Sequence, residues 1–398
     1  MFEHILEMVE SGQNIFLTGP GGCGKSWTIN KLKDVLSKRM NISITSTTGV
    51  SSYLIKGQTI HSFSGIGVFN PKQDLLKKIK KNRATKRIIE CDLLVIDEIS
   101  MLGSIYLSAL SKGFKLVRKN EKPFGGIQVI FTGDFYQLPP IQDDYAFESD
   151  IWKELNLKTI LLEKVYRFTD ELYSNMLARI RKGQHTPEDN VELFKRVKAF
   201  QELNMDDFEI QPTFISCKRI DVYEKNKEEL DKNPNELVMY LSRDDGDITF
   251  LDIVAPKKLE LKIGSQVMLT VNKNVEEGLV NGSRGVIIKL DSDMIAVKLM
   301  KGNIEIFERH EFIYEEDGKV IGKRLQFPFI LSYCLTIHKI QGSTIDCAIM
   351  DIGNSIFENS MSYVALSRVK SLSGLYLKAY SPYKIQVNKK VEEFYKLD

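Results

Sequence analysis

The first third of the chain alternates short apolar runs with patterns of helical spacing. Apolar runs occupy residues 14–17, 42–46, 93–96 and 127–131. Between the first two, a helical pattern is formed by Ile29, Leu32, Val35 and Leu36, at i, i+3, i+6 and i+7. Short buried strands that alternate with helices are typical of a parallel sheet covered by helices. The pattern therefore predicts an α/β domain over residues 1–168.

A second alternation follows, interrupted by a stretch of another character. Residues 171–200 have a helical pattern, and the strands predicted after them are 213–216, 329–335 and 348–352, with a polar helix ending near Asp231. Residues 257–323 contain VMLTV, GVIIKL, MIAVKL and IEIF, separated by Gly, Asn and Asp, which predicts a small β-barrel. We therefore expect a second α/β domain over 169–256 and 324–398, with the barrel inserted.

The composition limits the class of protein but does not indicate its function. The 398 residues are 43% hydrophobic and 27% charged, as in ordinary globular proteins. Apolar runs stay well short of the ~20 residues of a membrane-spanning helix, so we expect no membrane partner. The five cysteines are widely spaced, which indicates neither a zinc site nor a disulfide framework. We expect an intracellular protein, in the cytoplasm of a bacterium or virus-infected cell, or in a eukaryotic nucleus.

The charges are nearly balanced. With 55 basic and 53 acidic residues the net charge is +2, so any nucleic-acid binding must use a local groove. The one marked basic run covers residues 72–87. It is either a solvated helix face or a nucleic-acid contact.

Residues 19–26 read GPGGCGKS, after a predicted strand and before a predicted helix, which is the phosphate-binding loop (P-loop) pattern. Glycines let successive N–H groups face phosphate oxygens, and the helix N-terminus adds partial positive charge. Lys25 would reach the β and γ phosphates of ATP, and Ser26 would bind Mg²⁺. The expected nucleotide-binding residues are Gly19, Pro20, Gly21, Gly22, Cys23, Gly24, Lys25 and Ser26.

Polar residues end two further apolar strands. LLVIDE ends in Asp97 and Glu98, at the sheet edge where ligands of open α/β folds bind. Asp97 would hold Mg²⁺, and Glu98 would act as general base toward the attacking water. In VIFTGDFYQLPP, Gln137 can contact both a γ-phosphate and water. These residues predict ATP hydrolysis with Mg²⁺, but they do not separate a motor from other ATPases.

The order of motifs resembles the Pif (petite integration frequency) helicases. The strings that carry this resemblance are GPGGCGKS, TSTTGVSSYLI, GQTIHSF, VIDEISML, FGGIQVIFTGDFYQLPP, VYRF, LVNGSRGVI, LTIHKIQGST and SYVALSRVKS. The resemblance implies two RecA-like domains, a small wedge subdomain near 66–88 and a Src-homology-like barrel. It also implies 5′-to-3′ movement and unwinding of forked or G-quadruplex DNA in replication, recombination, repair or telomere maintenance.

The resemblance also assigns roles to residues. Arg167 of VYRF and Arg368 of VALSR would stabilise transition-state charge, and Gln341 and Gly342 would complete the nucleotide site. Hydroxyl groups would bond strand phosphates and rings would stack on bases, although Phe63 is equally consistent with a place in the core. The expected strand contacts are Thr47, Thr48, Thr59, His61, Ser62, Phe63, Thr336, His338 and Lys339.

One departure and two alternatives stay open. The family's adenine-reading glutamine is replaced by Phe2 in our alignment. We expect a monomer that acts on single-stranded DNA and on duplex or fork junctions. An RNA-directed helicase of the same superfamily, or a nucleotide-dependent protein that grips a strand without unwinding it, would carry similar motifs.

Overall fold

The computed structural model describes residues 1–67, 74–81, 84–168, 170–248, 251–252, 254–274, 277, 279–300, 302–316, 319–337, 339–340 and 344–397. The chain forms two compact units. Unit 1 consists of Met1–Arg167 and Val387–Asp398, and unit 2 of Phe168–Gln386.

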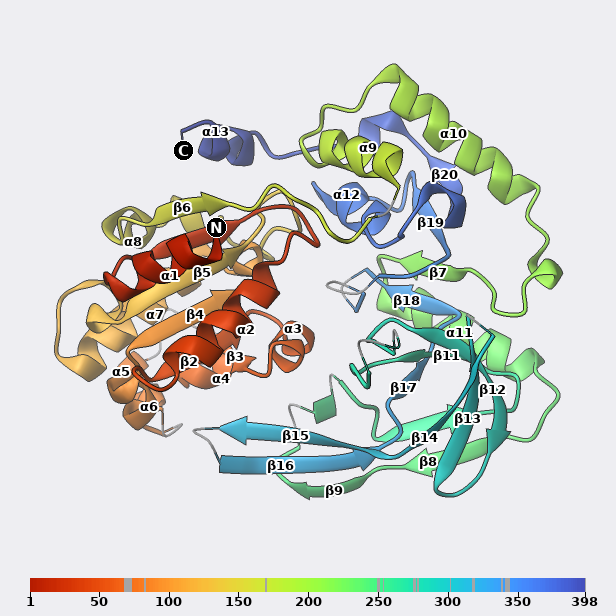
Figure 1. Ribbon diagram of the computed structural model, residues 1–398, viewed down its shortest axis with the longest axis horizontal. Helices are drawn as coiled ribbons and strands as arrows, with labels where there is room; N and C mark the ends of the chain where they lie inside the picture. Colours follow the sequence, from red (N-terminus) through yellow and green to blue (C-terminus); the bar gives the residue numbers. More distant parts are fainter. Residues whose placement is uncertain are drawn as a thin grey trace. The chain divides into compact units, whose positions relative to one another are not determined.

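Unit 1 is built on a parallel sheet of six strands in the order β3-β2-β4-β5-β1-β6 (Figure 1). These are β1 (Ile15–Thr18), β2 (Ile42–Ser46), β3 (Gln58–Thr59), β4 (Leu93–Asp97), β5 (Gln128–Gly133) and β6 (Lys158–Leu161). Because β4, β5 and β1 are neighbours and parallel, their carboxyl ends lie side by side. The loops after these three strands therefore share one edge of the sheet.

Helices cover both faces of this sheet, which explains why β1 and β4 are buried at every position. Along β1, Ile15 and Leu17 belong to one core and Phe16 to the other. The first core is closed by α1 (Phe2–Glu10) and α2 (Lys25–Leu36), and the second chiefly by α5 (Leu75–Lys81), α6 (Thr85–Glu90), α7 (Ser104–Arg118) and α8 (Asp150–Glu154). The predicted α/β architecture is confirmed.

The C-terminal helix α13 (Lys389–Leu397) groups with unit 1, which corrects the assignment of residues 324–398 to the second α/β domain. Val391 is buried in the second core of unit 1. Phe394 stacks on Phe147, with ring centroids 4.4 Å apart. Apolar contacts of this helix, rather than its position in the chain, decide which unit it joins.

Unit 2 contains a parallel sheet of four strands in the order β18-β7-β19-β20. Its strands are β7 (Thr213–Ser216), β18 (Cys334–Thr336), β19 (Ala348–Ile352) and β20 (Leu375–Tyr380), and its helices are α9 (Glu171–Arg181), α10 (Pro187–Gln201), α11 (Arg219–Lys232) and α12 (Met361–Leu366). The single helix predicted over 171–200 is two helices. Thr186 accepts a hydrogen bond from the Asp189 N–H, and Pro187 then begins α10, so the break is a capped helix start.

The rest of unit 2 is antiparallel. Its strands are β8 (Val238–Leu241), β9 (Arg243–Gly246), β10 (Lys258–Leu261), β11 (Gln266–Leu269), β12 (Arg284–Leu290), β13 (Met294–Leu299), β14 (Ile304–Glu308), β15 (His310–Glu316), β16 (Lys319–Gln326) and β17 (Phe329–Leu331). The insert starts before residue 257, because β8 pairs with β10 and β9 with β16. The predicted strand 329–335 is divided between β17, which pairs with β11, and β18, which pairs with β7.

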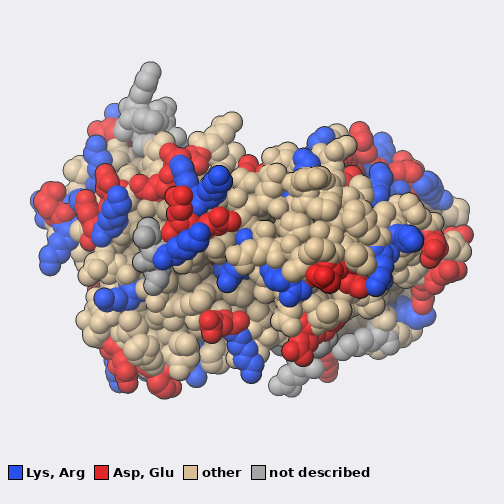
Figure 2. All heavy atoms as spheres, turned by 90° about the horizontal axis from the view of Figure 1, so that it is seen from above, with Lys and Arg blue, Asp and Glu red and all other residues tan. Residues whose placement is uncertain are grey.

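The surface carries mixed charge. On the face shown in Figure 2, lysine and arginine side chains are interspersed with aspartate and glutamate. Among the helices of the described residues, none is both long and apolar enough to cross a membrane.

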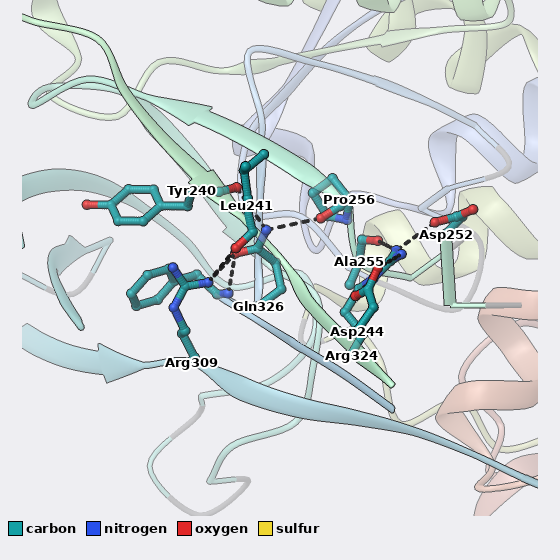
Figure 3. Close-up of polar contacts among 10 residues, drawn as sticks. Tyr240, Leu241, Asp244, Asp252, Ala255, Pro256, Arg309, Arg324 and Gln326 are labelled. Atoms are coloured by element: carbon teal, nitrogen blue, oxygen red, sulfur yellow. Dashed lines mark hydrogen bonds and ion pairs between the residues drawn. The ribbon is translucent and has the colours of Figure 1, made fainter. Parts of the chain in front are cut away.

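A buried polar network fastens β9 to β16 (Figure 3). Arg324 is 0% exposed, and its guanidinium binds Asp244 through two bonds of 2.8 and 2.9 Å and Asp252 through one of 2.7 Å. Next to it, the Gln326 amide donates to the Tyr240 carbonyl. Because Asp244 is paired with Arg324, RDDG can form a strand that its hydrophilic character conceals in the sequence.

Candidate functional site

The P-loop joins β1 to α2, and its glycines are required by close neighbours. A Cβ on Gly19 would lie 2.3 Å from the Leu162 carbonyl oxygen, and one on Gly22 2.4 Å from Arg167 Cβ. Gly22 also has a φ of 83°, which a side chain disfavours. Lys25 begins α2, and its ammonium donates to the carbonyl oxygens of Gly19 (2.6 Å) and Pro20 (3.0 Å). The lysine charge therefore lies over the loop.

Two carboxylates follow β4. Asp97 is 4% exposed, and its Oδ1 accepts from Thr132 Oγ1 and from the Glu98 N–H, both at 2.9 Å. Burial raises the pKa of Asp97, while these bonds and the Lys25 charge act in the opposite direction. Glu98 adopts a left-handed conformation (φ 55°, ψ 43°) that non-glycine residues rarely take and that is often found at functional sites.

The turn after β5 contains a residue that the sequence analysis did not single out. Asp134 is buried, accepts the Tyr136 N–H at 3.2 Å, and its Oδ2 receives the Gln137 amide at 3.3 Å. Asp134 thus orients Gln137. The signal that identified Asp97, a carboxylate at the end of a buried strand, could have identified Asp134 as well.

The two arginines lie in different units. Arg167 lies against Gly22 in unit 1, where the Tyr166 N–H donates to the Gly22 carbonyl at 2.9 Å. Arg368, in unit 2, donates to the carbonyls of Val364 (2.9 Å) and Ile340 (3.4 Å). Gln341 and Gly342, which the sequence analysis added to the nucleotide site, lie outside the described residues.

These donors suit a magnesium nucleotide. The loop and the Lys25 ammonium form a cradle for phosphate, and Ser26 and Asp97 are oxygen ligands of the kind that Mg²⁺ prefers. Magnesium usually takes only one or two protein ligands besides phosphate and water. The described part of the chain holds no cluster of three or more His, Cys, Asp or Glu side chains fit for a metal.

A segment predicted to contact the DNA, which begins at Thr47, is hydrogen-bonded to the end of β4, where Asp97 and Glu98 lie. The Thr47 N–H donates to the Asp97 carbonyl at 3.2 Å, and its hydroxyl donates to the Glu98 carbonyl at 3.0 Å. Thr48 and Thr59 each cap a short helix, α3 (Gly49–Leu54) and α4 (Ile60–Ser64). These hydroxyls therefore shape the segment as well as being candidates for phosphate contact.

Phe63 is a correction, because it is 0% exposed and packs against Phe114 in the core. Its ring cannot stack on a base without leaving that core. His61 is half-buried 4.7 Å from the Tyr106 ring, and burial lowers its pKa, which favours neutral imidazole. The Ser62 carbonyl accepts from the buried Arg87 guanidinium at 2.5 Å.

In unit 2, the candidate strand contacts follow β18. Thr336 is buried, and its hydroxyl accepts the Lys339 N–H at 3.2 Å. Lys339 is exposed. His338, another of the expected strand contacts, lies outside the described residues.

An aromatic pair lies beside the phosphate loop. Trp27 directly follows Ser26 and is 61% exposed. Phe2 approaches it edge-on, with centroids 6.1 Å apart, and the Lys31 ammonium lies 4.1 Å from the Phe2 centroid and 4.9 Å from that of Trp27. Phe2 is the residue that replaces the expected glutamine, so this pair is a candidate surface for a nucleobase.

Comparisons with known proteins agree with this geometry. The family model described as PIF1-like helicase matches residues 1–191, and one described as DNA helicase Pif1, 2B domain, matches residues 251–290. The chain is 32% identical to the ATP-dependent DNA helicase Pif1 of Bdellovibrio bacteriovorus, covering 98% of this chain and 90% of that protein. It is 33% identical to the ATP-dependent DNA helicase PIF1 of Danio rerio, over 98% of this chain but only 62% of that protein.

Solved structures are similar over the whole chain. The structure of Bacteroides sp Pif1 in complex with ADP-AlF4 has a TM-score of 0.85 and 26% identity, and covers 100% of this chain and 96% of that one. The structure of Pif1 from Bacteroides with ADP-AlF3 and single-stranded DNA has a TM-score of 0.69 and 26% identity, with 100% and 97% covered. Together with the site described above, these matches show that the chain belongs to the PIF1-like helicase family.

Proposed function

We propose that this chain is an ATP-dependent DNA helicase that moves along single-stranded DNA, 5′ to 3′. The observation that carries the proposal is the direct bonding of Thr47 to the backbone of Asp97 and Glu98. A candidate strand segment is thereby continuous with the carboxylates expected to act on ATP and Mg²⁺. A movement of these carboxylates at the nucleotide would be transmitted to the DNA strand through the two Thr47 hydrogen bonds.

The proposed roles follow the chemistry of each group. Lys25 and the loop bind the phosphates, and Ser26 and Asp97 hold Mg²⁺, which neutralises phosphate charge when bound. Glu98 takes a proton from the attacking water, and Gln137, held by Asp134, contacts the γ-phosphate. Arg167 and Arg368 stabilise the transition-state charge, and Gln341 and Gly342 contribute to the nucleotide site.

Strand binding uses Thr47, Thr48, Thr59, His61 and Ser62 in unit 1. Thr336, His338 and Lys339 serve in unit 2. We infer that the protein acts as a monomer inside the cell on forked or G-quadruplex DNA, in replication, recombination, repair or telomere maintenance. Both the Bdellovibrio and the Danio relative are named ATP-dependent DNA helicases, which supports this reading.

The test is to measure ATPase activity with and without single-stranded DNA, and unwinding of duplexes that carry a 5′ or a 3′ tail. We expect DNA to stimulate hydrolysis and only the 5′-tailed duplex to be unwound. An RNA strand of the same sequence distinguishes an RNA-directed enzyme. An active ATPase that DNA does not stimulate would contradict the proposal.

The assignment of the general base has its own test. Glu98→Gln should lower ATP turnover by about a hundredfold or more, because general-base catalysis contributes on that scale. Nucleotide binding, measured with a fluorescent analogue, should persist. Lys25→Ala should lose both binding and turnover. Full turnover by Glu98→Gln would remove Glu98 from this role.

A further inference from the structure

The C-terminal helix brings one hydroxyl to the edge of the nucleotide site. Tyr395 Oη shares a hydrogen bond of 2.8 Å with Thr18 Oγ1 and accepts the Phe135 N–H at 3.2 Å. Thr18 is the last residue before the phosphate loop, and Phe135 lies between Asp134 and Gln137. A single hydroxyl therefore bridges the ends of β1 and β5.

The rest of α13 fixes this hydroxyl in place. The Tyr395 ring stacks on Tyr136, with centroids 4.8 Å apart and an interplanar angle of 8°. One residue earlier, Phe394 stacks on Phe147, and nearer the helix start Lys390 pairs with Asp144 and Glu148. Aromatic stacking and ion pairs on separate residues hold the helix, so its hydroxyl has little freedom to move.

We propose that Tyr395 is a positioning residue for ATP hydrolysis, acting through the turn that carries Gln137. The inference rests on the proposed function. Backbone N–H groups in such turns need a partner, and Tyr395 supplies one to Phe135. Asp134 then holds Gln137 at 3.3 Å from the same turn. Loss of the hydroxyl would loosen the turn while leaving the ground-state nucleotide contacts of Lys25 in place.

The way the chain connects the two units suggests a mechanical role for the contact of Tyr395 with Thr18. Unit 2 is joined to unit 1 at Arg167–Phe168 and again at Gln386–Val387. The first connection ends at Arg167, against Gly22, and the second continues into α13 and Tyr395, against Thr18. Both connections therefore lead to the loops expected to bind nucleotide, so tension from unit 2 would reach them directly.

The experiment is Tyr395→Phe, which keeps the stacked ring and removes only the hydroxyl. We expect kcat for ATP to fall about three- to tenfold, the effect of one or two lost hydrogen bonds. The variant should still bind one ADP per chain, with unchanged affinity. Its affinity for ADP with aluminium fluoride should fall by the same factor as kcat. Such a split arises only if the hydroxyl acts in the transition state.

The matched control is Tyr383→Phe, because that ring is 85% exposed in unit 2 and should leave every value unchanged. Thr18→Val removes one partner of the hydroxyl but keeps its bond to Phe135, so it should give a smaller fall of the same kind, and the double variant should lose little more than Tyr395→Phe alone. Wild-type kcat and analogue affinity in Tyr395→Phe would overturn the inference. So would equal losses for ADP and the analogue, or binding below one nucleotide per chain. If the wild-type chain hydrolysed no ATP, the proposed function would fail instead.

Discussion

At the scale of single residues, the buried carboxylate of Asp97 lowers the stability of the fold while it serves the candidate nucleotide site. Its carboxylate is almost fully buried, and burial raises its pKa. A carboxyl group whose pKa is higher in the folded protein makes folding less favourable as the pH rises from the unfolded value through the folded one. Oδ1 of Asp97 accepts both described hydrogen bonds to this side chain. The side-chain oxygen of an asparagine could accept the same two bonds.

We therefore expect Asp97→Asn to raise the thermal stability of the nucleotide-free protein at pH 7 and to abolish Mg²⁺-dependent ATP hydrolysis. The gain in stability should shrink as the pH falls, because wild-type Asp97 then becomes neutral as well. Thermal unfolding across this pH range and an ATPase assay measure the two effects. A less stable variant at pH 7 would mean that the charge, through Lys25, stabilises the fold.

The position of Trp27 bears on how the protein recognises the base of the nucleotide. Phe2 has no hydrogen-bonding side-chain atom, and the Trp27 indole has one N–H donor and no acceptor, so the pair cannot reproduce the donor and acceptor of a glutamine amide. Stacking on an aromatic ring is worth about 1–3 kcal/mol per base and tolerates any base. We expect GTP and ATP to be hydrolysed with similar kcat/KM. Trp27→Ala should raise KM for both by about tenfold with kcat unchanged, and Trp27→Phe should recover most of the loss. Strong ATP preference would indicate another reader of the base.

Residue patterns predicted the strand, loop and helix around GPGGCGKS better than the place of Phe63. GPGGCGKS combines a spacing with a strand before it and a helix after it, so the backbone geometry follows from the residue types. A single aromatic such as Phe63 has no comparable context, and its place in the core depends on Phe114 from a distant helix. Tyr395 could not be predicted at all, because its partners precede it by more than 250 positions.

At the scale of elements, the basic run 72–87 acts partly as a support. Arg87 on α6 is buried, and its Nε donates to the Phe63 carbonyl at 2.6 Å and its Nη2 to the Ser62 carbonyl at 2.5 Å. It holds the end of α4, where His61 and Ser62 are proposed to meet the strand. Residues 72, 73, 82 and 83 of the run lie outside the described residues.

We expect Arg87→Ala to destabilise the protein by about 2–3 kcal/mol, since charged hydrogen bonds from a buried group are lost. Affinity for single-stranded DNA should fall as well, through disorder of α4. Its control is Lys86→Ala, because Lys86 is exposed and, among the described residues, its ion pair is with the exposed Glu90. If Lys86→Ala weakened DNA binding more than Arg87→Ala, the run would be a direct contact rather than a support.

Element boundaries could be predicted where the pattern is local. The strands 42–46, 213–216 and 348–352 agree with β2, β7 and β19, because each is a short apolar run with clear ends. β9 was missed because it is held by the pairing of Asp244 with Arg324 on β16, which no local pattern reveals. For the same reason, the apolar run 329–335 gave no sign that β17 and β18 join different sheets.

At the scale of the whole molecule, the near balance of charge limits how DNA can be held. The net charge is +2, and opposite charges are interspersed on the face in Figure 2. Among the proposed strand contacts most are hydroxyl groups, and Lys339 is the one lysine. Hydroxyl groups bond phosphate without releasing counterions, whereas each cation that neutralises a phosphate steepens the salt dependence.

We therefore expect a shallow salt dependence for single-stranded DNA. The slope of log K against log salt should be about −0.7, as for the single lysine among the proposed contacts. Lys339→Ala should reduce its magnitude by about 0.7, the contribution of one cation. Thr47→Val should weaken binding at every salt concentration and leave the slope unchanged. Fluorescence anisotropy with a labelled oligonucleotide provides the measurement. A slope steeper than about −5 would require a continuous basic groove, and would shift strand binding from these hydroxyl-rich segments to the lysines and arginines of the surface.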